Sequence, residues 1–200
     1  MYLFLKLMGA SLVSILLAAG LLASKLKSGV DKLSVANGDW RISMVTGSEE
    51  ADVMTRAIVA IGGLLASRRE DSMYYRLASV DGEPLRLDCT YRLRGSDYDA
   101  DWWSITAYGW DHYLIPNSED RFSFNGENVR READGSWELV VSAAPKPGNW
   151  LPVAPAGGKR QLGDDAADFD LILRLYTPGE AYLNSAQTAP LPTVEREHCE

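Results

Sequence analysis

The chain has 200 residues, of which 46% are hydrophobic and 24% are charged. This balance excludes an intrinsically disordered protein, a collagen and a membrane protein with many spans. The formal net charge is −8, and residues 1–33 contain four lysines and one aspartate, so the rest of the chain is more acidic than the total. Because nucleic-acid binding requires clustered Lys and Arg, the acidic body predicts no nucleic-acid partner.

The N-terminal segment predicts a membrane anchor. Residues 7–24 carry no charge, and a helix of that length spans roughly 27 Å, close to the hydrocarbon thickness of a bilayer. We therefore divide the chain into an anchor or signal segment (1–27), a juxtamembrane link (28–46), a globular domain (47–192) and a charged tail (193–200). Cleavage of the first segment as a signal peptide is the alternative.

The flanks of this segment bear on its orientation. A basic start followed by an apolar run is typical of export signals, which favours a single-pass inner-membrane protein with its body in the periplasm. Lys25, Lys27 and Lys32 follow the span and favour the opposite arrangement, a cytoplasm-facing body, because positive flanks tend to stay inside.

The two cysteines predict no disulfide. Residues 85–93 alternate strictly between apolar and polar side chains, which places Cys89 on the inner face of a strand as a small core residue. Cys199 lies in the charged tail. We therefore expect the two not to pair, and the cysteines leave the cellular compartment open.

Residues 48–69 predict a helix. Ser48 is a capping residue followed by acidic side chains, which complement the positive end of the helix dipole. Val53, Ala57 and Ile61 form an apolar stripe at helical spacing. Gly62 and Gly63 disfavour a helix, so their presence suggests close packing against a sheet.

From residue 73 onward the pattern changes to short alternating segments separated by turns. The expected strands are 40–45, 74–79, 85–93, 103–108, 121–124, 137–142 and 169–176. Residues 143–168 are rich in Pro, Gly and Ala and predict a long surface loop, pinned where Trp150 buries its indole. This order predicts a mainly β protein, an antiparallel sandwich with one helix before it.

The densest candidate for ligand binding is the segment 102–110. As a strand it places flat rings and hydroxyls alternately on one face, namely Trp102, Ser104, Thr106, Tyr108 and Trp110. Rings separated by hydroxyls suit the stacking of a sugar or another planar ligand. Cross-strand packing within the sheet is the alternative.

Two arginines and a tyrosine complete the candidate ligand-binding residues. Arg174 and Tyr176 lie on the more polar face of the expected strand 169–176. A partly buried Arg174 needs a carboxylate, a carbonyl or an anionic ligand. Arg56 on the expected helix raises the same question. An internal hydrogen bond is the alternative for each arginine.

The residues for catalysis and metal binding are sparse. His112 is the one histidine of the domain, so neither a catalytic triad nor a zinc site is expected. The aspartates of 97–101 lack the glycine and glutamate of a calcium loop. We predict no catalytic residue, no metal site and no cofactor.

The order of several motifs resembles the domain-of-unknown-function 1214 family, in its short, membrane-anchored bacterial form. The motifs within 40–192 are Gly47-Ser48, Asp81-Gly82-Glu83-Pro84-Leu85, Trp103-Ser104-Ile105-Thr106-Ala107-Tyr108, Asn149-Trp150-Leu151-Pro152 and Arg174-Leu175-Tyr176-Thr177-Pro178. The resemblance implies a jelly-roll-like β-sandwich, exported in Gram-negative bacteria, and a partner of the domain-of-unknown-function 1254 family. It implies no catalytic residue. Residues 96–101 depart from the family, which usually has a proline-containing segment there.

These observations predict a non-catalytic binding or interaction module of the cell envelope. The alternative is a carboxylate-dependent hydrolase that acts on envelope glycans or small metabolites. Asp81, Glu83, Asp134 and Glu138 are available for such a reaction, which requires two acids beside a cleft. The sequence leaves formation of a homo-oligomer open.

Overall fold

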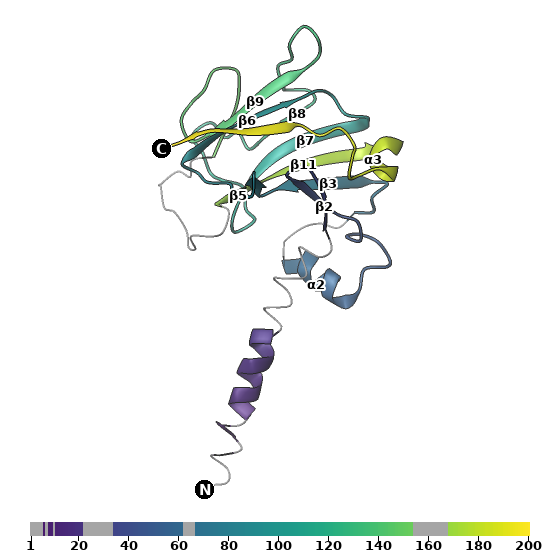
Figure 1. The fold of residues 1–200 in the computed structure, drawn as a ribbon, viewed down its shortest axis with the longest axis vertical. Helices are drawn as coiled ribbons and strands as arrows, with labels where there is room; N and C mark the ends of the chain where they lie inside the picture. Colours follow the sequence, from purple (N-terminus) through teal and green to yellow (C-terminus); the bar gives the residue numbers. More distant parts are fainter. Residues whose placement is uncertain (1–5, 7, 10, 22–33, 62–66, 154–167) are drawn as a thin grey trace.

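The computed structural model describes residues 6, 8–9, 11–21, 34–61, 67–153 and 168–200. Two β-sheets lie in two layers in its body (Figure 1). The larger sheet has the order β1 (Ser34–Asn37), β2 (Trp40–Ser43), β3 (Ser72–Leu77), β11 (Phe169–Pro178), β7 (Ala100–Gly109) and β8 (Ser123–Asn125). The smaller has the order β10 (Asn149–Pro152), β9 (Trp137–Ser142), β6 (Cys89–Gly95) and β12 (Thr193–Cys199). A short hairpin pairs β4 (Ser79–Val80) with β5 (Glu83–Pro84).

One hydrophobic core fills the space between the two sheets. Every second residue of each central strand points inward, as the pleat requires, and these residues join one buried cluster. Aromatic pairs connect the layers: Trp103 stacks on Trp137 with ring centroids 5.3 Å apart, and Tyr91 meets the edge of Phe169 at 5.9 Å. Such pairs add about 1 kcal/mol each to the burial of their surfaces.

The mainly β, antiparallel prediction is therefore confirmed. Every strand pair is antiparallel in the described chain except β9 with β10, which run parallel. The jelly-roll connectivity stays a prediction. Strands β1 and β2 fall within the predicted juxtamembrane link, and they extend the larger sheet by two strands.

The helix before the sandwich, α2 (Val53–Ile61), is shorter than predicted. It begins at Val53 because the Asp52 carboxylate accepts a hydrogen bond from the Thr55 N–H at 2.7 Å, so Asp52 rather than Ser48 acts as the cap. Val53 is 84% exposed, so the predicted apolar stripe is wrong at that position. Gly62 and Gly63 lie outside the described residues. A second short helix, α3 (Glu180–Asn184), follows β11.

Two strand boundaries differ from the prediction for local reasons. The segment predicted as a strand from 85 enters the sheet at Cys89, because Arg86 and Asp88 form a bidentate ion pair within a turn. The predicted loop 143–168 contains β10. Trp150 is buried there and its indole N–H donates to the Ser142 carbonyl at 3.1 Å, which confirms the predicted anchor. Residues 154–167 lie outside the described chain.

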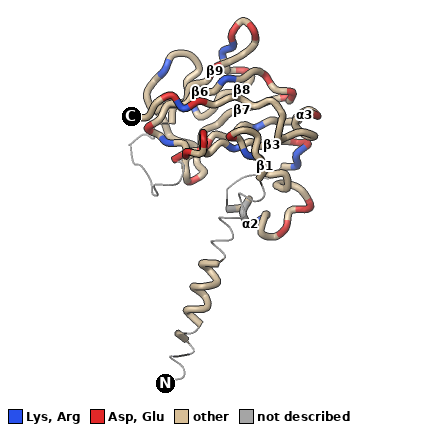
Figure 2. Tube along the Cα trace, viewed as in Figure 1, with Lys and Arg blue, Asp and Glu red and all other residues tan. Residues whose placement is uncertain are grey.

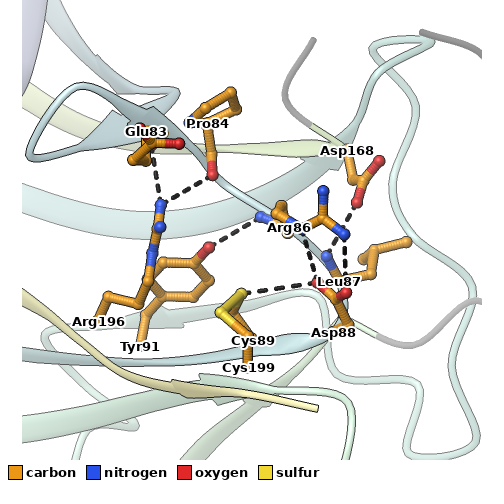
Figure 3. Close-up of a disulfide and its surroundings, with 10 residues drawn as sticks. All are labelled: Glu83, Pro84, Arg86, Leu87, Asp88, Cys89, Tyr91, Asp168, Arg196 and Cys199. Atoms are coloured by element: carbon orange, nitrogen blue, oxygen red, sulfur yellow. Dashed lines mark hydrogen bonds and ion pairs between the residues drawn. A yellow bond between two sulfur atoms is a disulfide. The ribbon is translucent and has the colours of Figure 1, made fainter. Parts of the chain in front are cut away.

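The prediction that the cysteines do not pair is wrong. Cys89 and Cys199 form a disulfide that joins β6 to β12 (Figure 3). Thr193–Cys199, predicted as a tail, is the edge strand of the smaller sheet. Nearby, Arg196 of β12 lies over the Tyr91 ring and donates to the carbonyls of Glu83 and Pro84. The C-terminal strand is thus held to the body both covalently and by hydrogen bonds.

The N-terminal segment is helical over residues 11–21. Its side chains are exposed, and it contains no charged residue (Figure 2). None of the helices in the described parts of the chain is long and apolar enough to cross a membrane. The predicted span 7–24 reaches beyond those parts, because residues 7, 10 and 22–24 are not described.

Candidate functional site

The outer face of the larger sheet brings most of the predicted ligand-binding residues together. Strand β11 lies between β3 and β7, and its register places Arg174 opposite both Tyr74 and Ser104. Tyr176 lies opposite Trp102 in the next pair of the same face. The residues of this outer face are Tyr74 and Arg76 of β3, Asp170, Ile172, Arg174 and Tyr176 of β11, and Trp102, Ser104, Thr106 and Tyr108 of β7.

The alternation predicted for segment 102–110 is confirmed over residues 102–108, and Trp110 lies in the turn after β7. Trp103, Ile105 and Ala107 point into the core and are at most 4% exposed. Trp102 and Trp110 are exposed. The hydroxyl residues between the rings therefore lie on the side away from the core, as the strand period requires. Ligand binding by these residues stays a prediction.

Arg174 lies at the centre of the outer face. One of its guanidinium nitrogens donates to the Tyr108 hydroxyl at 2.7 Å. The guanidinium carbon lies 5.1 Å from the centre of the Tyr108 ring and 5.7 Å from that of Tyr74, within range of cation–π attraction. Arg174 is half-buried, and no carboxylate of the described chain forms an ion pair with it. The internal hydrogen bond predicted for Arg174 is present, and it uses one of five N–H donors.

Three small or apolar side chains are neighbours of the arginine on the outer face. Ser104 is 4% exposed, Thr106 is 7% exposed and Ile172 is 6% exposed. Ile172 and Thr106 form one register pair, and Ser104 lies opposite Arg174 in the next. In the described chain, neither hydroxyl has a side-chain hydrogen bond. The centre of the outer face thus combines a cation with two hydroxyls that form no side-chain hydrogen bond to the described residues.

Exposed aromatic residues flank this polar centre at both ends of β7. At one end, Trp102 and Tyr176 meet edge to face with ring centroids 5.3 Å apart. At the other end, the chain turns after β7 and exposes Trp110, Tyr113 and Leu114. The Trp110 N–H donates to the Asp168 carbonyl, which holds this turn next to the start of β11.

Arg56 lies apart from the outer face, and no contact joins the two within the described chain. It is exposed on α2, and its guanidinium donates to the Ala51 carbonyl at 2.9 Å. The internal hydrogen bond that was its alternative role is therefore present.

Arg76 and Asp170 are functional candidates that the sequence reasoning missed. Asp170 is 5% exposed and accepts two hydrogen bonds from Arg76, at 2.7 and 3.0 Å. This bidentate geometry suits a guanidinium and a carboxylate. The sequence shows that Arg76 and Asp170 are charged. That the two side chains pair depends on the register between β3 and β11.

The four acids available to a hydrolase do not lie on this face. Asp81 and Glu83 belong to the β4–β5 hairpin, and Asp134 accepts hydrogen bonds from Ser136 in a turn. Glu138 lies on β9 of the smaller sheet, where it pairs with Arg92 and Arg94. No group of three or more His, Cys, Asp or Glu residues that could hold a metal occurs in the described chain.

Comparison with one known structure supports the fold. The VPA0106 protein from Vibrio parahaemolyticus matches with a TM-score of 0.57 and 20% identity, over 74% of this chain and 36% of that one. An uncharacterised protein from Burkholderia cenocepacia matches with a TM-score of 0.36 and 21% identity, over 65% of this chain and 30% of that one. This chain therefore spans about a third of the length of these structures. No curated protein matches it.

A family model covers more than half of the sequence. It spans residues 70–180 and describes a protein of unknown function, DUF1214. The matched region begins just before β3 and ends just after β11, so it contains the three strands that build the outer face. The chain belongs to the DUF1214 family.

Proposed function

We propose that this protein is a non-catalytic interaction module of the cell envelope. Its N-terminal helix tethers it to the inner membrane, its β body lies in the periplasm, and the outer face of the larger sheet binds a partner of the domain-of-unknown-function 1254 family. The resemblance of its motifs to short, membrane-anchored family members is the starting point of this proposal.

The distribution of exposed apolar side chains carries the proposal. Outside the N-terminal helix, the large hydrophobic side chains exposed in the described chain are Val53, Trp102, Trp110, Tyr113, Leu114 and Tyr176. All except Val53 lie on β7, on β11 or in the turn after β7. They form two groups, one at each end of β7, and exposed aromatic groups are typical of protein-binding surfaces.

The disulfide supports the proposed location. Cystine bridges persist in exported proteins and are rare in the cytosol, where thiols are kept reduced. The Cys89–Cys199 bridge therefore favours the periplasmic body over a cytoplasm-facing one. The exposed apolar side chains of helix 11–21, among them Leu12, Ile15 and Leu16, favour a lipid environment over water.

The length of the structural relative supports a partner. In the Vibrio protein, the region similar to this chain is about a third of a longer polypeptide. A fold that is joined to further structure in one protein can bind a separate protein in another. The exposed rings of Trp102, Trp110 and Tyr113 can bury a large surface area when such a partner binds.

The hydrolase alternative gains no support from the described residues. It requires two acids roughly 5–9 Å apart beside the reacting bond. The acid that the register places among the outer-face residues is Asp170, and Arg76 already holds both of its oxygens.

Site-specific cross-linking in living cells tests the proposal. A photoreactive phenylalanine analogue replaces Tyr113, which is 75% exposed. A matched variant carries it in place of Glu195, on the other sheet, whose side chain is 62% exposed. We expect an adduct with a 1254-family protein at position 113 and none at 195. No adduct with an envelope protein at 113, or the same adduct at both positions, would contradict the proposal.

A further inference from the structure

We propose that the polar centre of the outer face binds an oxyanion carried by a small ring, such as the carboxylate of an acidic sugar or the phosphate of a phosphorylated one. Arg174 provides the charge, Ser104 and Thr106 provide hydrogen bonds, and the neighbouring aromatic rings provide the apolar contact. The inference rests on the proposed binding function and names a second, smaller ligand of the same face.

The charge of the face argues for an anion. Among the strand residues that the register aligns here, Arg41, Arg76 and Arg174 are cationic and Asp170 is anionic. Asp170 is neutralised by Arg76. A positive region on a chain of net charge −8 attracts oxyanions that the rest of the surface repels.

The environment of Arg174 leaves its charge unbalanced. Its hydrogen-bond partner, the Tyr108 hydroxyl, is a phenol rather than a carboxylate. The guanidinium has cation–π contacts with the Tyr74 and Tyr108 rings, and neither contact brings a carboxylate to it. A half-buried cation gains most from an anion that accepts two parallel N–H donors, which carboxylates and phosphates do.

Two hydroxyls lie next to this cation. Ser104 is the register partner of Arg174, and Thr106 is the next outward residue of β7. Neither has a side-chain hydrogen bond to another described residue. Both side chains are largely buried, so their hydroxyls can donate to an oxyanion that reaches them beside Arg174.

An aromatic surface adjoins the polar centre. Trp102 is two residues from Ser104 on the same face and lies diagonally to Arg174. Diagonal neighbours are about 7–8 Å apart, within the span of one sugar ring. Trp102 is 36% exposed, and its edge-to-face contact with Tyr176 holds the indole in place. A ring whose oxyanion meets Arg174 can therefore rest its apolar side on Trp102.

Titration of the purified full-length protein in detergent tests the inference without the protein partner. The probes are glucuronate, glucose 6-phosphate, inorganic phosphate and uncharged glucose, followed by calorimetry and tryptophan fluorescence. We expect binding of glucuronate, glucose 6-phosphate or both, and at least tenfold weaker binding of glucose. The preferred probe identifies the oxyanion as carboxylate or phosphate. Binding of inorganic phosphate shows that the anion alone suffices.

Matched variants locate the site. Arg174→Met should weaken binding of the preferred probe at least tenfold, Arg174→Lys less, and Thr106→Val a few-fold. Arg94→Met, on the outer face of the other sheet, should leave it unchanged. Thermal unfolding checks that each variant is folded, and Thr106→Val preserves side-chain shape if Arg174→Met does not fold. Absence of binding by all probes, equal binding of glucose, or binding unchanged in Arg174→Met and Thr106→Val would overturn the inference. Because the protein partner is absent, this result is independent of the cross-linking result.

Discussion

The two outer faces of the sandwich differ in how their polar groups are used. On the smaller sheet, Arg92 pairs with Glu138 and Glu197, and Arg94 pairs with Glu138 and Glu195. On the larger sheet, the central arginine contacts phenol groups, and exposed rings flank it. One face satisfies its own charges, whereas the other retains donors, hydroxyls and aromatic surface that a ligand can use.

The ion pairs on the outer face of the smaller sheet also protect the edge of that sheet. Strand β12 is an edge strand, and its outward residues Glu195 and Glu197 are engaged by arginines of β6. Figure 2 shows charges of both signs side by side in the region of β6, β9 and the C-terminus. Charged edge strands resist pairing with other chains. The smaller sheet is therefore suited to structure, and we propose that the larger one serves recognition.

The largest expected effect comes from removing the covalent link of the smaller sheet. The Cys89–Cys199 bridge closes a loop with a sequence separation of 110 residues, and a loop of about 100 residues contributes roughly 4–5 kcal/mol by restricting the unfolded chain. We expect the double variant Cys89→Ser/Cys199→Ser to lose about that much free energy of unfolding in denaturant titrations. Reduced wild-type protein should match the variant. An unchanged midpoint would refute a structural role of the bridge.

The next effect concerns the ion pair between Arg76 and the buried Asp170 on the larger sheet's outer face. Arg76→Met leaves the carboxylate of the buried Asp170 without its two charge-assisted hydrogen bonds. We expect a loss of about 2–3 kcal/mol in denaturant unfolding, because an unpaired buried charge is costly. Adding Asp170→Leu should restore part of the stability. If Arg76→Met/Asp170→Leu is less stable than Arg76→Met alone, the unpaired Asp170 charge is not the cause of the loss.

A smaller difference separates the central arginines of the two faces. Arg174→Met removes one hydrogen bond and two cation–π contacts, and we expect a loss of about 1 kcal/mol. Arg94→Met removes ion pairs whose side chains are 41–62% exposed, and we expect a loss below about 0.5 kcal/mol. Thermal unfolding of both variants under the same conditions compares them. A larger loss of stability in Arg94→Met than in Arg174→Met would contradict the difference that we infer between the two faces.

The smallest expected effect is a dependence of stability on acid pH. The Arg131 guanidinium hydrogen-bonds the Asp97 carboxylate and lowers its pKa below the ordinary value. A lowered folded pKa contributes stability above the pKa of the unfolded chain, near 4, and this stability disappears as the pH falls through the folded value. Asp97→Asn should therefore weaken the pH dependence of the unfolding midpoint below about pH 4. An identical pH profile would exclude this pair as a contributor.

The sequence predicted the parts of the fold that have a clear period. Residues 169–176 alternate between the core and the outer face, and they form most of β11. Tyr176 and Trp102 were predicted on polar faces of separate strands, and the register joins them. What the sequence did not reveal is which strands are neighbours, since pairing is non-local. For that reason Tyr74 and Arg76 of β3 were absent from the predicted site.

The disulfide was missed for a related reason. Strand β12 has charged residues on its outer face and little apolar surface inside, so its sequence lacks the alternation of hydrophobic residues that predicts a strand. Without that strand, Cys199 has no predicted neighbour. The helix start was missed because Ser48 and Asp52 are both good caps, and the choice between them depends on the turn that precedes Ala51.

Hydroxyl-radical footprinting tests the central claim most directly, since it compares the two faces in one sample. Trp102 and Tyr113 report on the larger sheet and its turn, and exposed His198 of β12 reports on the smaller one. We predict that Trp102 and Tyr113 are oxidised more slowly in native envelopes than in the purified protein, while His198 is oxidised equally in both. Equal oxidation of all three in the two preparations would contradict the claim that the outer face of the larger sheet is a binding surface.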